Sequence, residues 1–326
     1  MKLSVVIPVL NEETNLPVLY ERVAGELQSL ACDFEILFVD DGSTDSSAER
    51  IAALHRADAR VKMLSMSRNF GHQAALTAGM DHATGDAVIA MDADLQHPPD
   101  LIRELVLLWK EGYEVVYTVR QTTEAAGPLK RASATLFYRV FRALSDIDLP
   151  ANSADFRLLD RRVVEAFRQI RERTRFLRGL VGWAGFRSIP VPYQANARLS
   201  GQTKYSPTRM IRLAIDGLVS FSTTPLYVAI YVGGLLALLG VAYLLYALYA
   251  RFVTGNVVPG WTSLIILVTF VGGIQLVLMG IIGIYIGKIY EEAKQRPLYL
   301  IRETLGFEGS PPVPPKPAFP ERFSQS

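Results

Sequence analysis

The sequence contains a single cysteine, Cys32, among 326 residues. One cysteine cannot form an internal disulfide framework, so we expect a reducing, cytosolic environment for the folded part. Residues 1–8 carry too short an apolar run for a signal peptide and no cleavage site, so we do not expect export of the N-terminal part. The net charge is only +2, and no basic stripe with interleaved aromatic residues is present. We therefore expect no nucleic-acid partner.

Two common nucleotide-binding signatures are also missing. The apolar run Leu3–Ile7 predicts a first strand, but no Gly-x-Gly-x-x-Gly follows it. This absence disfavours a dinucleotide-binding fold, and the P-loop pattern is not found either. A site for phosphate groups in this chain therefore needs a metal ion and basic side chains.

Short apolar runs alternate with helical patterns through the first 120 residues, which predicts an α/β fold. Such alternation favours right-handed crossovers and a mostly parallel sheet with helices on both faces. Pro8 is expected to end the first strand because it lacks the backbone donor that a central strand needs. The other predicted strands are Phe34–Val39, Val61–Ser65, Asp86–Met91, Tyr113–Val119, Asp155–Leu159 and Phe186–Tyr193. The predicted helices are Asn15–Leu30, Ser46–Ala57, Gln73–Ala83 and Asp100–Glu111.

Acidic residues follow three of the predicted strands. Glu12 comes after the first, Asp40 and Asp41 after the second, and Asp92 and Asp94 after the fourth. Since the carboxyl ends of parallel strands share one edge, these groups are predicted to lie on one rim, where open α/β sheets bind ligands.

Asp94 and the amide of Gln96 are hard oxygen donors of the kind that suits Mg²⁺ or Mn²⁺. The alternative is that Asp94 only caps the helix that starts after Pro98 and Pro99. An isolated Asp-x-Asp would favour the capping role, whereas the acidic residues after the other strands favour a metal site.

Two stretches near the C-terminal end are long and apolar. Residues 225–250 contain no charged residue, and 26 residues form a helix of ~39 Å, longer than the ~30 Å core of a bilayer. A second uncharged stretch covers residues 252–287, with its most apolar part at 264–286. Basic residues before the first stretch and after the second predict a hairpin with both ends in the cytoplasm.

The residues around this hairpin complete the predicted organisation. Residues 207–222 have the pattern of an interfacial amphipathic helix. Glycines of the second span permit close packing against the first span or against another subunit in a homo-oligomer. The proline-rich stretch 310–317 is predicted to be disordered. We expect a cytoplasmic domain at 1–206, the interfacial helix at 207–222, a transmembrane hairpin at 223–290 and a partly disordered cytoplasmic tail at 291–326.

Three segments together resemble glycosyltransferase family 2: Val6–Glu13 (VIPVLNEE), Val39–Asp45 (VDDGSTD) and Met91–Pro99 (MDADLQHPP). The downstream element Arg198–Lys204 and the two spans make the chain more similar to the polyisoprenyl-phosphate glycosyltransferases, over roughly residues 1 to 290. This resemblance implies a GT-A-type nucleotide-sugar-binding domain, a UDP-sugar donor, a polyprenyl phosphate acceptor and a place in the cytoplasmic membrane.

The resemblance also implies roles for individual residues on the donor side. Asp41 would bind a uracil-type base, and Asp92 would contact the nucleotide or the shell of the metal. Asp94 and Gln96 would be the metal ligands. The nucleotide pocket would be lined by Pro8, Leu10 and Glu12, and phosphate would be neutralised by Arg120 and Arg131.

On the acceptor side, Arg198 and Lys204 would receive the lipid phosphate, and Asp155 matches the acidic residue of the bacterial Asp-Phe-Arg-Leu-Leu form. A phosphate monoester with a second pKa near 6 is largely dianionic at neutral pH and needs little deprotonation. We therefore favour Asp155 as an orienting group, while a role as general base stays open. Attack from the face opposite the leaving group would invert the anomeric configuration.

The Gln-x-x-Arg-Trp signature of processive synthases is absent, which favours transfer of one sugar per acceptor. The resemblance thus implies an inverting, membrane-anchored enzyme that moves one sugar, which we expect to be glucose, from a UDP-sugar to undecaprenyl phosphate. Mannosyl or aminoarabinosyl donors are alternatives, and so is a membrane subunit that binds a sugar nucleotide without turnover.

Overall fold

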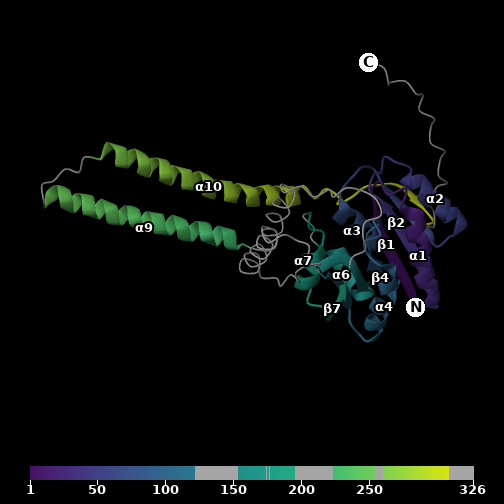
Figure 1. Cartoon of the computed structure of the whole chain (residues 1–326). Helices are drawn as coiled ribbons and strands as arrows, with labels where there is room; N and C mark the ends of the chain where they lie inside the picture. Colours follow the sequence, from purple (N-terminus) through teal and green to yellow (C-terminus); the bar gives the residue numbers. More distant parts are fainter. Residues whose placement is uncertain (122–152, 174, 176, 195–222, 254–259, 308–326) are drawn as a thin grey trace, which may run out of the picture.

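The computed structural model describes residues 1–121, 153–173, 175, 177–194, 223–253 and 260–307. Within these ranges the chain forms an α/β domain and two long helices. The helices run side by side away from the domain, as Figure 1 shows. The architecture is the predicted one: a mixed, mostly parallel sheet followed by two long apolar helices.

The domain is built on a sheet with the strand order β7-β5-β6-β4-β1-β2-β3-β8. Four neighbouring strands, β4, β1, β2 and β3, are parallel, and so are β5 and β7. In contrast, β6 is antiparallel to both β4 and β5, and β8 is antiparallel to β3. The strands are β1 Lys2–Val9, β2 Asp33–Asp40, β3 Val61–Met66, β4 Ala87–Ala90, β5 Val115–Arg120, β6 Ser153–Asp160, β7 Ser188–Tyr193 and β8 Ile301–Leu305.

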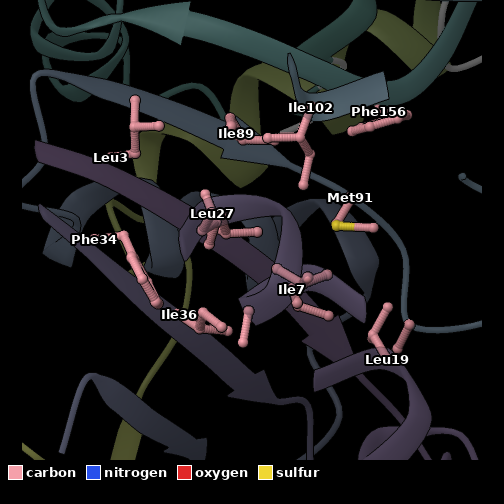
Figure 2. Packing of buried hydrophobic residues seen from close by; sticks show 14 of the residues in the cluster. Leu3, Ile7, Leu19, Leu27, Phe34, Ile36, Ile89, Met91, Ile102 and Phe156 are labelled. Atoms are coloured by element: carbon pink, nitrogen blue, oxygen red, sulfur yellow. The ribbon is translucent and has the colours of Figure 1, made fainter. Parts of the chain in front are cut away.

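Helices cover both faces of the sheet, and alternate residues of the central strands point to opposite sides. Ile7 and Phe38 face the cluster packed under α1, α2 and α4, whereas Val6 and Leu37 face the cluster under α3, α6 and α7. Figure 2 shows part of the first cluster. Burial on both faces explains why these strands are continuous apolar runs. The helices are α1 Leu16–Ser29, α2 Ser47–Ala57, α3 His72–His82, the 3₁₀ helix η1 Pro99–Leu101, α4 Ile102–Lys110, α6 Arg161–Gln169 and α7 Leu177–Trp183.

Pro8 lies inside β1 and does not end it, which corrects the expectation from the sequence. Val6 accepts a hydrogen bond from Met91 on the β4 side, whereas Val9 accepts one from Asp41 on the β2 side. Pro8 is two residues after Val6, so its missing donor faces the β4 side. Pairing of β1 with β4 has already ended there at Val6 and Ala90. The missing N–H therefore costs no ladder hydrogen bond.

The two predicted apolar stretches are helices, α9 Thr224–Phe252 and α10 Trp261–Ala293. Their most apolar segments, Leu226–Ala247 and Phe270–Ala293, are long and apolar enough to cross a membrane and are not buried against the domain. The predicted interfacial helix at 207–222 and the proline-rich stretch at 310–317 lie outside the described residues.

The chain returns to the domain after α10. Residues 301–305, assigned to a tail by the sequence analysis, form the edge strand β8. This strand was not predicted from the sequence.

Candidate active site

The loop after β4 carries Asp92 and Asp94 at the carboxyl edge of the sheet. Leu95 takes a positive φ of 60°, and the Gln96 backbone donates a hydrogen bond to Asp94 Oδ1 at 3.1 Å. This turn brings His97 back toward Asp92, whose backbone N–H donates to His97 Nδ1 at 3.1 Å. Since Nδ1 accepts, His97 carries its hydrogen on Nε2, which lies 3.6 Å from Asp92 Oδ2.

Aromatic packing holds His97 in place. Its ring is buried, stacks on Phe156 with centroids 5.2 Å apart, and meets the edge of Tyr193 at 5.9 Å. Phe156 belongs to β6 and Tyr193 to β7, so the β4 loop is fixed against two further strands. His97 is thus a positioning residue for Asp92 that the sequence analysis did not single out.

Asp155 on β6 is buried and bound by two arginines. Arg178 donates from Nε to Oδ1 at 2.9 Å and from Nη2 to Oδ2 at 2.8 Å, and Arg157 Nη2 lies 3.2 Å from Oδ1. Burial alone would raise the pKa of Asp155, but the charges of Arg178 and Arg157 and the contact with His72 hold it well below its usual value. Burial lowers the pKa of Arg157 to about 10, so this arginine stays protonated at neutral pH.

His72 connects the two carboxylates. Its Nε2 lies 3.4 Å from Asp92 Oδ1 and 3.4 Å from Asp155 Oδ2. Desolvation lowers the pKa of His72, but the nearby Asp155 and Asp92 outweigh that effect and raise it above its ordinary value. His72 is the first residue of α3, so the cluster joins the ends of three elements, α3, β4 and β6.

Asp41, which is predicted to bind the nucleotide base, is buried and is hydrogen-bonded to the segment that precedes His72. Its carboxylate accepts hydrogen bonds from the backbone of Phe70 at 2.7 Å and of Gly71 at 3.0 Å. Burial raises the pKa of Asp41. Next to it, Gly42 has φ +74°, and a Cβ there would lie 2.7 Å from the backbone carbon of Arg68. Only glycine fits that position. Base binding by Asp41 stays a prediction.

The loops after β1 and β2 are joined by hydrogen bonds. Asn11, with a positive φ of 56°, accepts from the Thr44 backbone at 2.8 Å, and Ser47 Oγ accepts from the Glu12 backbone at 3.0 Å. Glu12 Oε2 accepts from Asn15 at 2.7 Å. Of the other residues predicted to line the pocket, Pro8 is buried in β1 and Leu10 is half-buried just beyond it.

Arg120 ends β5 and pairs in register with Tyr193. Burial raises the pKa of Tyr193, and the charges of Arg120, Asp92 and Asp94 all act on its hydroxyl. The end of β5 thus places Arg120 beside Tyr193, whose ring packs against His97 of the β4 loop. The remaining predicted cations, Arg131, Arg198 and Lys204, lie outside the described residues.

The donor set fits a magnesium or manganese ion that is shared with a bound diphosphate. Within the described ranges, no group of three or more His, Cys, Asp or Glu side chains forms a metal cage. Mg²⁺ is commonly held by only one or two carboxylates together with substrate phosphates. Asp92 Oδ1 is buried and accepts no hydrogen bond from the part of the chain described here, but His72 Nε2 lies 3.4 Å away, so a cation bound at this oxygen would share it with His72. Asp94 and Gln96 follow it on the same loop.

The structure adds His72, His97, Arg157 and Arg178 to the residues predicted from sequence. His72 had a usable signal, because it comes six residues after β3 and so also follows the carboxyl end of a parallel strand. Arg178 had none, since α7 is placed by a contact distant in sequence, the hydrogen bond from the Leu177 backbone to Gln73 Oε1 at 3.1 Å.

Comparisons with known proteins identify the family of this chain. The model of "Glycosyl transferase family 2" matches residues 4–168. The "Uncharacterized glycosyltransferase YkcC" of Bacillus subtilis (strain 168) is 44% identical over 305 residues, 94% of each chain. The "Prophage bactoprenol glucosyl transferase homolog" of Escherichia coli (strain K12) is 39% identical, covering 93% of this chain and 99% of that protein. The "Bactoprenol glucosyl transferase" of Shigella phage SfV is 40% identical, covering 93% and 98%.

Among solved structures, mannosyl-3-phosphoglycerate synthase from Rubrobacter xylanophilus superposes with a TM-score of 0.48 and 18% identity, over 66% of this chain and 71% of that one. We draw nothing from so loose a likeness. The family match and the full-length relatives are decisive: this chain belongs to glycosyl transferase family 2 and is a glycosyltransferase.

Proposed function

We propose that this glycosyltransferase transfers one glucose from UDP-glucose to a polyprenyl phosphate, undecaprenyl phosphate, at the cytoplasmic surface of a membrane. One observation carries the proposal: proteins named bactoprenol glucosyl transferase match more than nine-tenths of this chain, the two long apolar helices included. The carboxylate cluster at the edge of the sheet is consistent with it.

On the donor side, Asp92, Asp94 and Gln96 would hold Mg²⁺ or Mn²⁺ together with the diphosphate of the donor. When bound, the ion would neutralise the negative charge that develops on the departing diphosphate. Arg120, which lies beside Tyr193 at the end of β5, and Arg131 would add positive charge there. Asp41 and the loops after β1 and β2 would surround the nucleotide, with Pro8, Leu10 and Glu12 at its side.

On the acceptor side, a phosphate oxygen would attack the anomeric carbon. The new carbon–oxygen bond forms as the bond to the diphosphate breaks, and the electron pair leaves with UDP. Attack from the opposite face inverts the configuration at that carbon. A dianionic phosphate brings no proton that must be removed first.

Asp155 is a poor proton acceptor because Arg178, Arg157 and His72 stabilise its charge. We assign it an orienting role: it holds Arg178, whose side chain is 36% exposed, at the edge of the site. Guanidinium groups commonly bind phosphate oxygens, and Arg178 held in this way would add positive charge near the acceptor. Arg198 and Lys204, just ahead of the predicted interfacial segment, would meet the acceptor phosphate at headgroup depth.

Transfer by the purified full-length protein tests the proposal. Radiolabelled UDP-glucose, undecaprenyl phosphate and Mn²⁺ should yield a labelled lipid extractable into organic solvent and released by mild acid. UDP-galactose, GDP-mannose and UDP-aminoarabinose would be compared as donors. Preference for another donor would overturn the assignment of glucose. Binding of UDP-glucose without any lipid product would favour a non-catalytic subunit instead.

A further inference from the structure

The chain that leaves α10 is fastened to the catalytic domain at several points. Arg173 donates from its backbone to Glu292 Oε1 at 2.6 Å and from its side chain to the Arg296 carbonyl at 3.0 Å. Three residues later, Tyr299 donates to Asp81 at the end of α3 at 2.7 Å. Burial and this contact raise the pKa of Tyr299, so its hydroxyl keeps its hydrogen at neutral pH. The second long helix is therefore tied directly to the domain.

Beyond this attachment, β8 adds to the edge of the sheet. It pairs antiparallel to β3, with Leu64 opposite Thr304 and Ser65 opposite Glu303, and the register shifts between Ser65 and Met66. Ile301 packs against the core cluster that also contains Leu64. Figure 1 shows this strand in yellow within the domain, and the strand order places it beside β3 at the edge of the sheet.

Arg302 of β8 is linked to the loop after β2 through the buried hydroxyl of Ser65. Arg302 Nη2 donates to Ser65 Oγ at 3.1 Å, and Ser65 Oγ donates to Asp40 Oδ2 at 3.0 Å. The other oxygen of Asp40 accepts from the Ser43 backbone at 2.9 Å. Ser65 and Asp40 are fully buried. A serine hydroxyl has a single hydrogen, so Ser65 can serve Asp40 and still accept from Arg302.

We propose that Arg302, in the strand that follows α10, is a positioning residue for the nucleotide-binding loop, residues 40–45. The inference rests on the proposed function in one respect, that this loop surrounds the donor nucleotide. The guanidinium polarises the Ser65 hydroxyl, which strengthens its hydrogen bond to Asp40. Asp40 in turn fixes Ser43, whose Oγ accepts from the Asn11 backbone at 3.0 Å in the neighbouring loop.

The first test needs no donor. Amide hydrogen exchange in residues 40–47 would be measured on the full-length protein without nucleotide. Arg302→Gln and Ser65→Ala should speed exchange there about 3- to 10-fold, the scale of losing one hydrogen bond. The matched control is Arg171→Gln, which removes a contact with Asp81 beside Tyr299 and leaves Ser65 untouched. Unchanged exchange in Arg302→Gln, or equal acceleration in the control, would overturn the proposal.

Steady-state kinetics supply the second test. Arg302→Gln should raise KM for UDP-glucose about 3- to 10-fold with kcat within about twofold, and Arg302→Lys should recover part of the loss. The variant that combines Arg302→Gln with Ser65→Ala should raise KM no more than Ser65→Ala alone, because both changes break the same chain of hydrogen bonds. Additive losses, or a fall in kcat alone, would contradict the path.

If Ser65→Ala does not fold, the Gln and Lys variants at Arg302 still decide the question. If the wild type transfers no glucose, the proposed function fails while the exchange comparison still stands.

Discussion

Arg178 binds Asp155 through both carboxylate oxygens, with Nε 2.9 Å from Oδ1 and Nη2 2.8 Å from Oδ2. A two-point pairing of this kind fixes the plane of the carboxylate as well as its distance. The two residues come from α7 and β6, so the pair also attaches a short helix to the sheet. Both properties bear on the proposed role of the pair in holding the acceptor.

Arg178→Lys should lower transfer about 10- to 100-fold, because one ammonium cannot reproduce a two-point contact with a carboxylate. Arg178→Gln should be at least as damaging and should also lower the melting temperature, since it removes a partner of a buried charge. Initial rates and thermal unfolding measure the two effects. Arg162→Gln, an exposed change on α6, is the matched control. Equal activity of Arg178→Lys and wild type would rule out a role for the pair in transfer.

Asp155→Asn separates an orienting group from a general base. The pKa of Asp155 lies well below its usual value, so the wild-type residue is ionised throughout the range from about pH 5.5 to about pH 9. If it orients Arg178, the variant should stay impaired at the alkaline end, where a phosphate with pKa near 6 is already dianionic. Single-turnover rates across that range give the answer. Full recovery of the variant above about pH 8 would identify Asp155 as a base.

The parallel core of the fold could be predicted because its strands are buried on both faces. Such strands appear in the sequence as short continuous apolar runs between turn residues. The direction of β6 could not be predicted, because an apolar run carries no sign of whether its neighbour runs parallel or antiparallel. β8 was missed for a different reason: it is a five-residue edge strand that pairs with β3 more than 200 residues earlier.

The candidate site also contains some residues that the sequence could place and others that it could not. Asp92 and Asp41 were located from sequence because each follows a parallel strand, and the rule for sheet edges then places them together. His72 obeys the same rule after β3, but only acidic residues were counted. Arg178 could not be found this way, since its contact with Asp155 depends on how α7 packs against α3. The functional roles of these residues stay predictions.

Glu35 in β2 makes the fold sensitive to acid. Burial would raise its pKa, but hydrogen bonds from Lys62, Ser4 and Thr84 lower it to about 2. A carboxyl group with a depressed folded-state pKa stabilises above its unfolded pKa, near 4, and that contribution is lost as the pH falls toward 2. The shift corresponds to ~3 kcal/mol at neutral pH.

Glu35→Gln should therefore lower the melting temperature at pH 7 by several degrees, with a difference from wild type that shrinks below about pH 4. Thermal unfolding from neutral to acidic pH measures both. Glu21→Gln, on the exposed face of α1, should behave like wild type throughout. A difference that stays constant down to about pH 2 would mean that the carboxylate charge is not what stabilises this part of the sheet.

Asp94→Ala should abolish most transfer and leave the fold unchanged. The side chain is half-buried at the edge of the sheet, so its loss empties no core volume. The expected fall in rate is at least about 10²-fold, the scale of removing one electrostatic stabiliser from an active site.

Asp100→Ala tests the capping alternative, because Asp100 lies in the first turn of the helix that follows the same loop. If Asp94 served only as a cap, the two variants would lose similar stability and keep similar activity. If it is a metal ligand, only Asp94→Ala should lose activity, and the Mn²⁺ concentration needed for half-maximal rate should rise. Unchanged turnover of Asp94→Ala in saturating Mn²⁺ would remove Asp94 from the metal site.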